Sequence, residues 1–196
     1  SYYPLNNDTL DYYGSNDGTN SGATRNTTDY KIGAAYTFDG SSSYISADSI
    51  TSTCGSSGCD DITLSVWVKT SSEDNQGILG WSDISENYDI AWLKVQNGHN
   101  MIYNRLNSGT RQIMGEGDTT VNDGEWHHLV FTINGSGNKL YVDSTEELVT
   151  YSYGGSSTTK FLDDTSGVDT FEIGNVPLSS GTPHYHYFNG SIDEVQ

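Results

Sequence analysis

Residues 62–69 read ITLSVWVK, and this stretch decides the fold class. Apolar residues at every second position, namely Ile62, Leu64, Val66 and Val68, alternate with residues that are mostly polar. Alternate side chains of a β-strand point to opposite faces, so a period of two predicts a strand with one face turned to a core. The stretch therefore predicts a sheet that packs on one side and is solvated on the other.

The same pattern continues outward along the chain. Residues 126–134 (WHHLVFTIN) repeat the alternation, and the Gly-rich turn 134–138 leads into a strand over 139–143. The other predicted strands are 34–38, 44–47, 77–81, 88–95, 101–106, 112–115, 147–151, 171–174 and 187–195. No stretch shows a sustained helical period, and Gly interrupts nearly every segment. About a dozen short strands with regular turns predict an all-β protein, with two antiparallel sheets packed as a sandwich.

Length and charge narrow the range of functions. The chain has 196 residues and is expected to form one domain over 1–196, since all-β sandwiches of this size are commonly single units. The formal net charge is −18, from 26 acidic and 8 basic residues. Such a charge repels nucleic acid and an anionic membrane surface, so neither is expected as a partner. The acidic residues have three open interpretations: a solvated shell, a salt-rich habitat, or clusters that bind Ca²⁺.

The two cysteines, Cys54 and Cys59, are too few for a thiolate metal site and are not spaced as Cys-x-x-Cys. The prediction is a disulfide that closes one small loop, which places the chain in an oxidising compartment. No apolar run is long enough to span a bilayer, so direct membrane insertion is not expected. The chain stops directly after a strand-like stretch, and we expect a domain of a longer extracellular or cell-surface protein.

Six short motifs occur in an order that resembles one known family. They are DYYGSNDG at 11–18, GAAYTFDG at 33–40, LSVWVK at 64–69, DGEWHH at 123–128, LYVD at 140–143 and FNGSIDEV at 188–195. Together they resemble laminin G-like domains of the concanavalin A-like lectin/glucanase jelly-roll superfamily. The resemblance implies a jelly-roll sandwich of about 12 to 14 strands that binds or adheres, often to glycans. One departure is Ser144, where the family usually has Gly.

The resemblance also implies a structural calcium, because related jelly rolls often use one to tie the first strands to the last. A hard cation takes about six to eight oxygen ligands from carboxylates, carbonyls and waters. The matching segments offer such oxygens on Asp11, Asn16, Asp39, Gly40 and Asp193. The alternative is that Asp11 and the Asp39-Gly40 pair form turns, in which the carboxylate caps its own backbone.

Aromatic and polar residues supply candidate ligand contacts. Sugars present flat C–H faces that stack on aromatic rings, and their hydroxyls bind polar side chains. The candidates are Trp81, Tyr88, Trp92, Tyr103, Arg105, His184 and His186, and the aromatic supply also includes Tyr151 and Tyr153. Alternation places Tyr88 and Trp92 on one strand face, and Tyr103 and Arg105 on one face of the next strand. Two alternatives stay open: the aromatic rows pack in the core, as is expected for Trp67 and Trp126, and the His184–His186 pair binds a transition metal.

The adjacent pair His127-His128 is not expected to bind one metal, because neighbouring residues on a strand point to opposite faces. We expect one ring to be hydrogen-bonded inside the sandwich and the other to border a sheet face. The pair is therefore interpreted as structural.

Catalysis lacks a recognisable motif. A retaining glycosidase needs two carboxyls about 5 Å apart. Jelly-roll glucanases of the superfamily supply them from one strand as Glu-x-Asp-x-x-Glu, a string that this chain lacks. We therefore expect a non-catalytic extracellular module that binds a glycan or a cell-surface glycoprotein, with other domains of the same chain as further partners. The alternatives are a protein-adhesion or structural module with no glycan site and, more remotely, a glycoside hydrolase or lyase.

Overall fold

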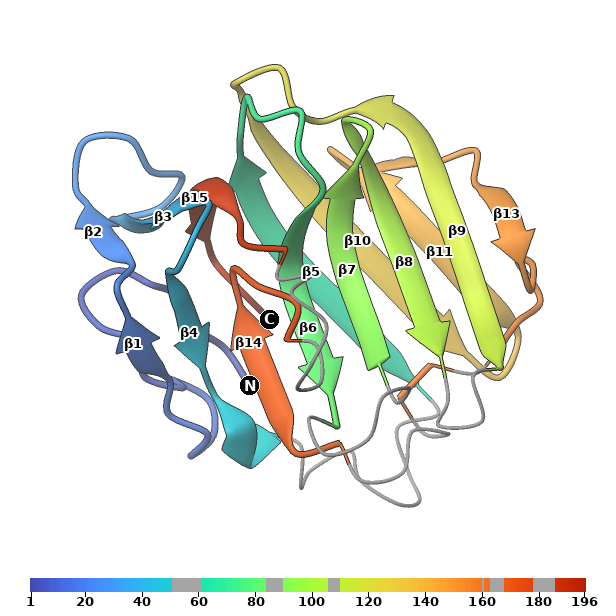
Figure 1. Ribbon diagram of the computed structural model, residues 1–196, viewed down its shortest axis with the longest axis horizontal. Helices are drawn as coiled ribbons and strands as arrows, with labels where there is room; N and C mark the ends of the chain where they lie inside the picture. The colour runs from blue at the N-terminus through green and yellow to red at the C-terminus, as the bar shows by residue number, and fades with distance from the viewer. Residues whose placement is uncertain (51–60, 84–89, 106–109, 160, 163–167, 178–185) are drawn as a thin grey trace.

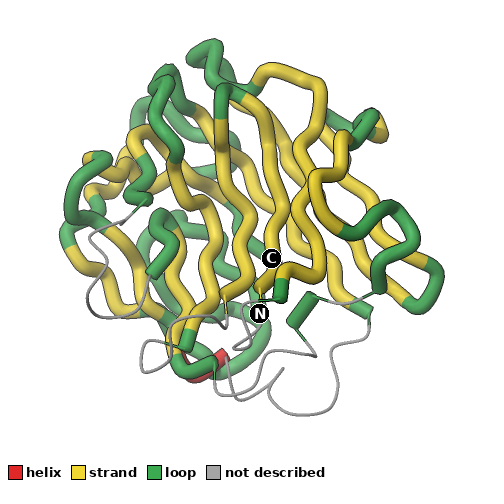
Figure 2. Tube along the Cα trace, turned by 45° about the vertical axis from the view of Figure 1, so that its right-hand side comes forward, coloured by secondary structure: helices red, strands yellow, loops and turns green. Residues whose placement is uncertain are grey.

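A computed structural model describes residues 1–50, 61–83, 90–105, 110–159, 161–162, 168–177 and 186–196, except the side chains of residues 104 and 105. Two antiparallel sheets pack face to face, which confirms the predicted all-β sandwich (Figure 1). The one helical segment of the described residues is a 3-10 turn at Asp48–Ile50, red in Figure 2. None of the described helices is long and apolar enough to cross a membrane. Cys54 and Cys59 lie outside the described residues, so their disulfide stays a prediction.

One sheet has eight strands and lies toward the viewer in Figure 1. Its order is β1 (Thr19–Ser21), β4 (Tyr44–Ser46), β14 (Thr170–Ile173), β6 (Gln76–Ser82), β7 (Ile90–Gln96), β8 (His99–Arg105), β9 (Arg111–Thr120) and β13 (Thr150–Tyr153). The strands β6 to β9 follow one another in the chain, so successive hairpins build this half of the sheet. Strand β14 lies between β4 and β6, so a segment from near the C-terminal end of the chain pairs with two strands from its first half.

The second sheet has seven strands and lies behind the first. Its order is β12 (Thr145–Glu146), β11 (Gly137–Val142), β10 (Trp126–Asn134), β5 (Ile62–Lys69), β15 (Asn189–Asp193), β3 (Ala35–Asp39) and β2 (Thr24–Asn26). The last strand, β15, pairs with β3 on one side and with β5 on the other. Both ends of the chain are thereby fixed in the same sheet.

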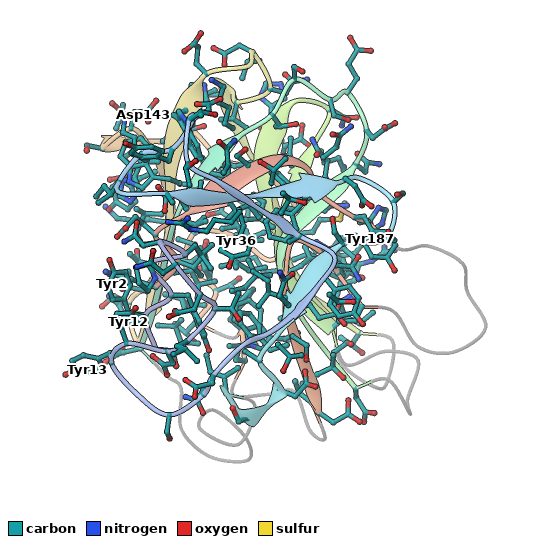
Figure 3. The ribbon with its side chains drawn as sticks, turned by 90° about the vertical axis from the view of Figure 1, so that its left-hand side faces the viewer. Tyr2, Tyr12, Tyr13, Tyr36, Asp143 and Tyr187 are labelled. Carbon is teal, nitrogen blue, oxygen red and sulfur yellow. The ribbon has the colours of Figure 1, made fainter. Side chains whose placement is uncertain are left out.

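The core lies between the two sheets and follows the predicted alternation. Val66 and Val68 of β5 are fully buried, as are Leu93 and Val95 of β7 in the opposite sheet. Figure 3 views the sandwich from one edge and shows Asp143 and Tyr187 on opposite sides. We call the solvent side of the eight-stranded sheet the front face and that of the seven-stranded sheet the back face.

The observed strands differ from the predicted ones mainly where they are short or leave the sheet. β5 and β10 match their predictions residue for residue, whereas β1, β2 and β12 were not predicted because two or three residues show no alternation. The strand predicted over 147–151 begins only at Thr150. The Glu147 carboxylate instead accepts hydrogen bonds from the N–H and hydroxyl of Thr119, at 2.9 and 2.6 Å.

The expected core positions of Trp67 and Trp126 are wrong. Both side chains are half-buried on the back face. Because Val66 and Val68 take the core side of β5, the pleat turns Trp67 outward. Trp126 pairs with Lys69 on that same outward side.

Candidate functional site

Strand register assembles an aromatic row on the front face. Trp92 of β7 pairs with Tyr103 of β8, which pairs with Met114 of β9, and Met114 pairs with Tyr153 of β13. Directly opposed residues of an antiparallel sheet project from the same face. Leu93, the chain neighbour of Trp92, is in the core, so the row faces away from the core.

The rings at one end of this row are in contact. Trp92 and Tyr103 stack with centroids 4.4 Å apart and planes inclined by 18°. The His186 ring meets Trp92 edge-on, at 6.2 Å and 75°. Tyr103 is 6% exposed, whereas Trp92 is only half-buried. Three predicted ligand residues therefore lie together, and Trp92 is more exposed than Tyr103.

Arg111, at the start of β9, connects the two tyrosines of the row. Its Nη1 donates to the Tyr153 hydroxyl at 2.7 Å and its Nε to the Tyr103 hydroxyl at 3.4 Å. The guanidinium also lies over the Tyr153 ring, with Cζ 4.7 Å from the centroid. A guanidinium has five N–H donors, so Arg111 retains donors for a ligand at this end of the row.

Lys94 is the buried cation of the front face. It follows Trp92 by two residues on β7, so both side chains project from the same face, and it is 5% exposed. Its Nζ lies 4.9 Å from the centroid of the Trp92 ring. Burial lowers the pKa of Lys94 to about 8, although Glu116 on β9 opposes this shift.

The segment 175–177 bounds the front face beside β6. It packs onto Gly77 and Gly80, which pair with Lys94 and Trp92 respectively. A Cβ atom at Gly80 would lie 2.6 Å from a backbone carbonyl oxygen of this segment, a distance that side chains do not tolerate. Glycine at both positions therefore lets the segment lie next to the row.

The back face also carries a stacked tryptophan, and the polar groups beside it are hydrogen-bonded. Trp67 and His128 stack with centroids 4.8 Å apart. The Nε2 atom of His128 lies 2.8 Å from the Ser65 hydroxyl. Trp126 Nε1 donates to the Asp29 carboxylate at 2.9 Å. These groups need no ligand to complete their hydrogen bonds.

The front face, in contrast, carries polar groups that lack a hydrogen-bond partner. Nε1 of Trp92 is buried and has no hydrogen-bond partner among the described residues. Within the same part of the chain, Lys94 makes no hydrogen bond and no ion pair. A buried donor without an acceptor costs free energy that a ligand can recover. This contrast selects the front face as the candidate ligand site.

The other predicted ligand residues are not brought to this site. Trp81 is 4% exposed and packs in the core against Phe171, with ring centroids 4.6 Å apart, so core packing replaces its expected ligand contact. Tyr88 and His184 lie outside the described residues, as does the side chain of Arg105. The transition-metal alternative for His184 and His186 therefore stays a prediction.

Sequence reasoning missed Lys94 and Arg111. The alternation that assigns Trp92 to one face assigns Lys94 to the same face, so that signal was present. Arg111 and Tyr153 meet only because β9 pairs with β13, a contact between segments about forty residues apart that local patterns do not encode.

Asp39 ends β3 and caps the turn that follows it. Its Oδ1 accepts hydrogen bonds from the N–H groups of Ser42, Ser41 and Ser43 at 2.8, 2.9 and 3.0 Å. These donors, that of Ser42 foremost, hold the pKa of Asp39 well below its usual range. Gly40 has a φ of 72° and donates its N–H to the carbonyl of Phe188. The turn-forming alternative for Asp39 and Gly40 is therefore confirmed.

Asp11 caps the loop that contains Asn16. Its carboxylate accepts hydrogen bonds from the N–H groups of Tyr2, Gly14 and Asn16 at 2.9, 3.0 and 3.2 Å. Burial acts to raise the pKa of Asp11, but these donors outweigh it and hold the pKa well below its usual range. Both oxygens of Asp11 are thus occupied by donors of its own loop.

Asp193 is fully buried at the end of β15. Its Oδ2 accepts hydrogen bonds from the N–H groups of Lys31 and Ile32 at 2.9 and 2.8 Å, and its Oδ1 has no partner among the described residues. Burial raises the pKa of Asp193 to about 6.

Two of the residues expected to bind calcium, Asp39 and Asp193, lie far apart. Asp39 pairs with Asn189, and Asp193 follows four residues later on β15, which places the two aspartates about 13 Å apart. The described part of the chain contains no group of three or more His, Cys, Asp or Glu residues that could hold a metal ion. These aspartates therefore do not fit the implied shared site, and calcium binding by the chain stays a prediction.

His127 lies between two carboxylates where β10 begins. Its Nδ1 is 2.8 Å from Asp143 and its Nε2 is 3.0 Å from Asp123. Burial acts to lower the pKa of His127, but the two carboxylates outweigh it and raise the pKa. The neighbouring His128 faces the back, as expected for one member of the pair, and burial lowers its pKa.

Comparison with known proteins yields one family and one curated relative. Residues 39–196 match the concanavalin A-like lectin/glucanases superfamily. Over 92 residues the chain is 35% identical to the basement membrane-specific heparan sulfate proteoglycan core protein of Mus musculus. This match covers 45% of the present chain and 2% of that protein, so the chain corresponds to a small part of its relative.

Two solved structures resemble the chain along nearly its whole length. Domain 4 of AbnA, a GH43 extracellular arabinanase from Geobacillus stearothermophilus in complex with arabinotriose, has a TM-score of 0.67 and 21% identity, covering 100% of this chain and 89% of that one. The CBM40 of a Ruminococcus gnavus IT-sialidase bound to α2,3 sialyllactose has a TM-score of 0.62 and 18% identity, covering 93% and 91%. At these identities the likeness shows the fold alone.

Proposed function

Because this chain belongs to the concanavalin A-like lectin/glucanases superfamily, we propose that it is a non-catalytic module that binds carbohydrate through its front face. One observation carries the proposal: Trp92, Tyr103 and Tyr153 form an aromatic row, with the half-buried Trp92 at one end and the exposed Tyr153 at the other. Aromatic rings stack on the C–H faces of sugars. The row crosses three strand spacings, about 14 Å, which suits an oligosaccharide better than a single ring.

The solved structures support this choice of ligand class. Both hold an oligosaccharide, arabinotriose in one and sialyllactose in the other. The family also supports an extracellular location, because the curated relative is a basement membrane proteoglycan and the arabinanase is extracellular. We propose the same location for this chain, with a glycan or a cell-surface glycoprotein as its partner.

A glycan microarray, probed with the wild type and with Trp92→Ala, tests the proposal. Binding to a defined set of glycans that the variant loses supports it. Uniform silence of a folded wild type on a broad array contradicts it. Folding of both proteins is checked by far-UV and near-UV circular dichroism.

Protein adhesion is a second candidate function, favoured by exposed tyrosines away from the front face. Tyr12 and Tyr13 are 57% and 88% exposed, and Figure 3 shows both at the outer margin of the molecule. Exposed apolar side chains of this size are typical of interaction sites. Silence on the array, combined with loss of cell-surface binding in a Tyr12→Ser/Tyr13→Ser variant, would favour this function.

Hydrolysis is a third candidate, since Glu116 and Asp118 lie two residues apart on the front side of β9. Their Cα atoms are about 7 Å apart, and glycosidases separate their carboxyls by about 5 to 9.5 Å. However, Asp118 is exposed and accepts a hydrogen bond from the Leu148 N–H at 3.3 Å. Product release from any glycan bound on the array would overturn the non-catalytic proposal.

A further inference from the structure

We propose that the front face selects an acidic sugar, whose carboxylate is bound by the ammonium of Lys94 and the indole Nε1 of Trp92. The inference rests on the proposed glycan binding and adds the chemical class of the ligand. It starts from two donors without a hydrogen-bond partner among the described residues: the buried Nε1 atom of Trp92 and the ammonium of Lys94, a residue that is 5% exposed.

Both unpartnered groups are hydrogen-bond donors with no accepting capacity. An ammonium has three N–H donors and an indole has one, and neither accepts a hydrogen bond. The Trp92 Nε1 atom is buried, so bulk water does not supply its missing acceptor, and Lys94 as a residue is only 5% exposed. The complementary ligand group is therefore an acceptor, and next to an ammonium it is an anion.

The two donors are close enough to share one carboxylate. Lys94 Nζ lies 4.9 Å from the centroid of the Trp92 ring, and the indole Nε1 belongs to the same fused ring system. The two nitrogens are thus separated by about 7 Å or less, and hydrogen bonds of about 2.8 Å to the two oxygens of one carboxylate span that gap. The flexible stem of lysine lets its ammonium move to meet the ligand.

A neutral sugar leaves the site incomplete. A hydroxyl can accept a hydrogen bond from Lys94 but carries no charge to offset the buried ammonium. Glu116, the carboxylate that acts on Lys94 through space, lies on β9, and the Cα atoms of the two residues are two strand spacings, about 10 Å, apart. Arg111 adds a second cation beyond Tyr103, in a chain whose net charge is −18. Two cations therefore lie on this face, on which β9 also carries the carboxylates of Glu116 and Asp118.

The test compares glycans that differ only in the carboxyl group. An array carries uronic-acid and sialic-acid glycans beside the same glycans after reduction of the carboxyl to a hydroxymethyl group, and sulfated neutral glycans form a third arm. Wild type is compared with Lys94→Met, which preserves side-chain length without the charge, and with Lys139→Met as the control. Lys139 is half-exposed on β11 and pairs with Glu146 at 2.7 Å, away from the front face.

We expect wild type and Lys139→Met to bind acidic glycans at least about tenfold more tightly than their reduced forms, and Lys94→Met to lose this preference. Equal binding of acidic and reduced glycans, with dependence on Trp92, would overturn the acidic-sugar inference and leave the proposed function intact. Exclusive binding of sulfated glycans would also overturn it. An absence of binding to all three sets of glycans would overturn both the acidic-sugar inference and the proposed carbohydrate binding. If Lys94→Met does not fold, Lys94→Gln replaces it.

Discussion

The indole of Trp92 and the phenol of Tyr103 stack across β7 and β8, with ring centroids 4.4 Å apart, on the side of the sheet that faces away from the core. The stack follows from strand register, since the two residues are directly paired. Arg111 then fixes the Tyr103 hydroxyl from β9. A ligand therefore meets rings that are already ordered, which reduces the entropy lost on binding.

Lys94→Met should stabilise the protein. The folded-state pKa of Lys94 is about 8, below that of an exposed lysine, so the folded protein binds this proton less tightly than the unfolded chain. The charged Lys94 therefore destabilises the folded protein. This effect is complete below about pH 8 and disappears as the pH rises toward about 10.4, the pKa of lysine in the unfolded chain. We expect Lys94→Met to raise the free energy of unfolding by about 2 kcal/mol at neutral pH, with a smaller gain at about pH 10.

Urea unfolding at both pH values measures this effect. Lys139→Met is the control, because an exposed ion pair contributes little. A Lys94→Met protein less stable than the wild type, or an unchanged difference at high pH, would contradict the account.

Asp143→Asn should lower the pKa of His127. The wild-type pKa is raised by the carboxylates of Asp143 and Asp123, and the asparagine retains size without charge. Because the folded pKa of His127 exceeds the unfolded one, its contribution to stability is present below about pH 6.5 and is lost as pH rises through the folded pKa. The pKa of Asp143 is lowered in the folded protein, so the contribution of Asp143 to stability is lost as the pH falls through that pKa.

Histidine NMR titrations of the two proteins provide the measurement. The stability difference between them should be larger at about pH 5.5 than at about pH 8.5. An unshifted His127 resonance in Asp143→Asn would rule out the clamp between the two carboxylates.

Asp39→Ala should destabilise the protein by about 1 kcal/mol, because the N–H groups of Ser41, Ser42 and Ser43 lose their acceptor. Thermal unfolding is followed in excess Ca²⁺ and in EDTA. The turn-capping role predicts the same loss in both buffers. A calcium-dependent rise in the unfolding temperature of the wild type that Asp39→Ala abolishes would assign Asp39 to a metal site instead.

Gly80→Ala should displace the segment 175–177 from β6. The new Cβ would lie 2.6 Å from the Asn175 carbonyl oxygen, and relief of such overpacking typically costs about 1–3 kcal/mol. Gly135→Ala is the matched control, since no atom lies within 4 Å of its added Cβ. Calorimetric unfolding compares the two variants, and equal unfolding temperatures would show that the contact on Gly80 is not close.

Local patterns in the sequence predict the strands well and the faces less well. The alternation in β5 and β10 gives their bounds to the residue, because core and solvent differ sharply across a half-buried sheet. Alternation assigns residues to two faces but does not say which face is inside. Trp81 and Trp92 were therefore equal candidates, although one is in the core and the other on the front face.

The candidate site depends on contacts that no local pattern encodes. The row from Trp92 to Tyr153 requires the register of β7, β8, β9 and β13, and that register includes bulges. The predicted calcium residues were grouped because their segments meet in the same sheet. β15 separates Asp39 from Asp193 along its length, and backbone N–H groups bind Oδ1 of Asp39 and Oδ2 of Asp193.

The central claim is that the front face binds carbohydrate through Trp92. Its most direct test is a calorimetric titration of the strongest array ligand into the wild type, Trp92→Ala and Trp67→Ala. We expect Trp92→Ala to bind the ligand at least about tenfold more weakly than the wild type, a loss of about 1.4 kcal/mol of binding free energy. We expect Trp67→Ala to retain wild-type affinity. Wild-type affinity in Trp92→Ala, with loss of binding in Trp67→Ala, would contradict the claim and place the site on the back face.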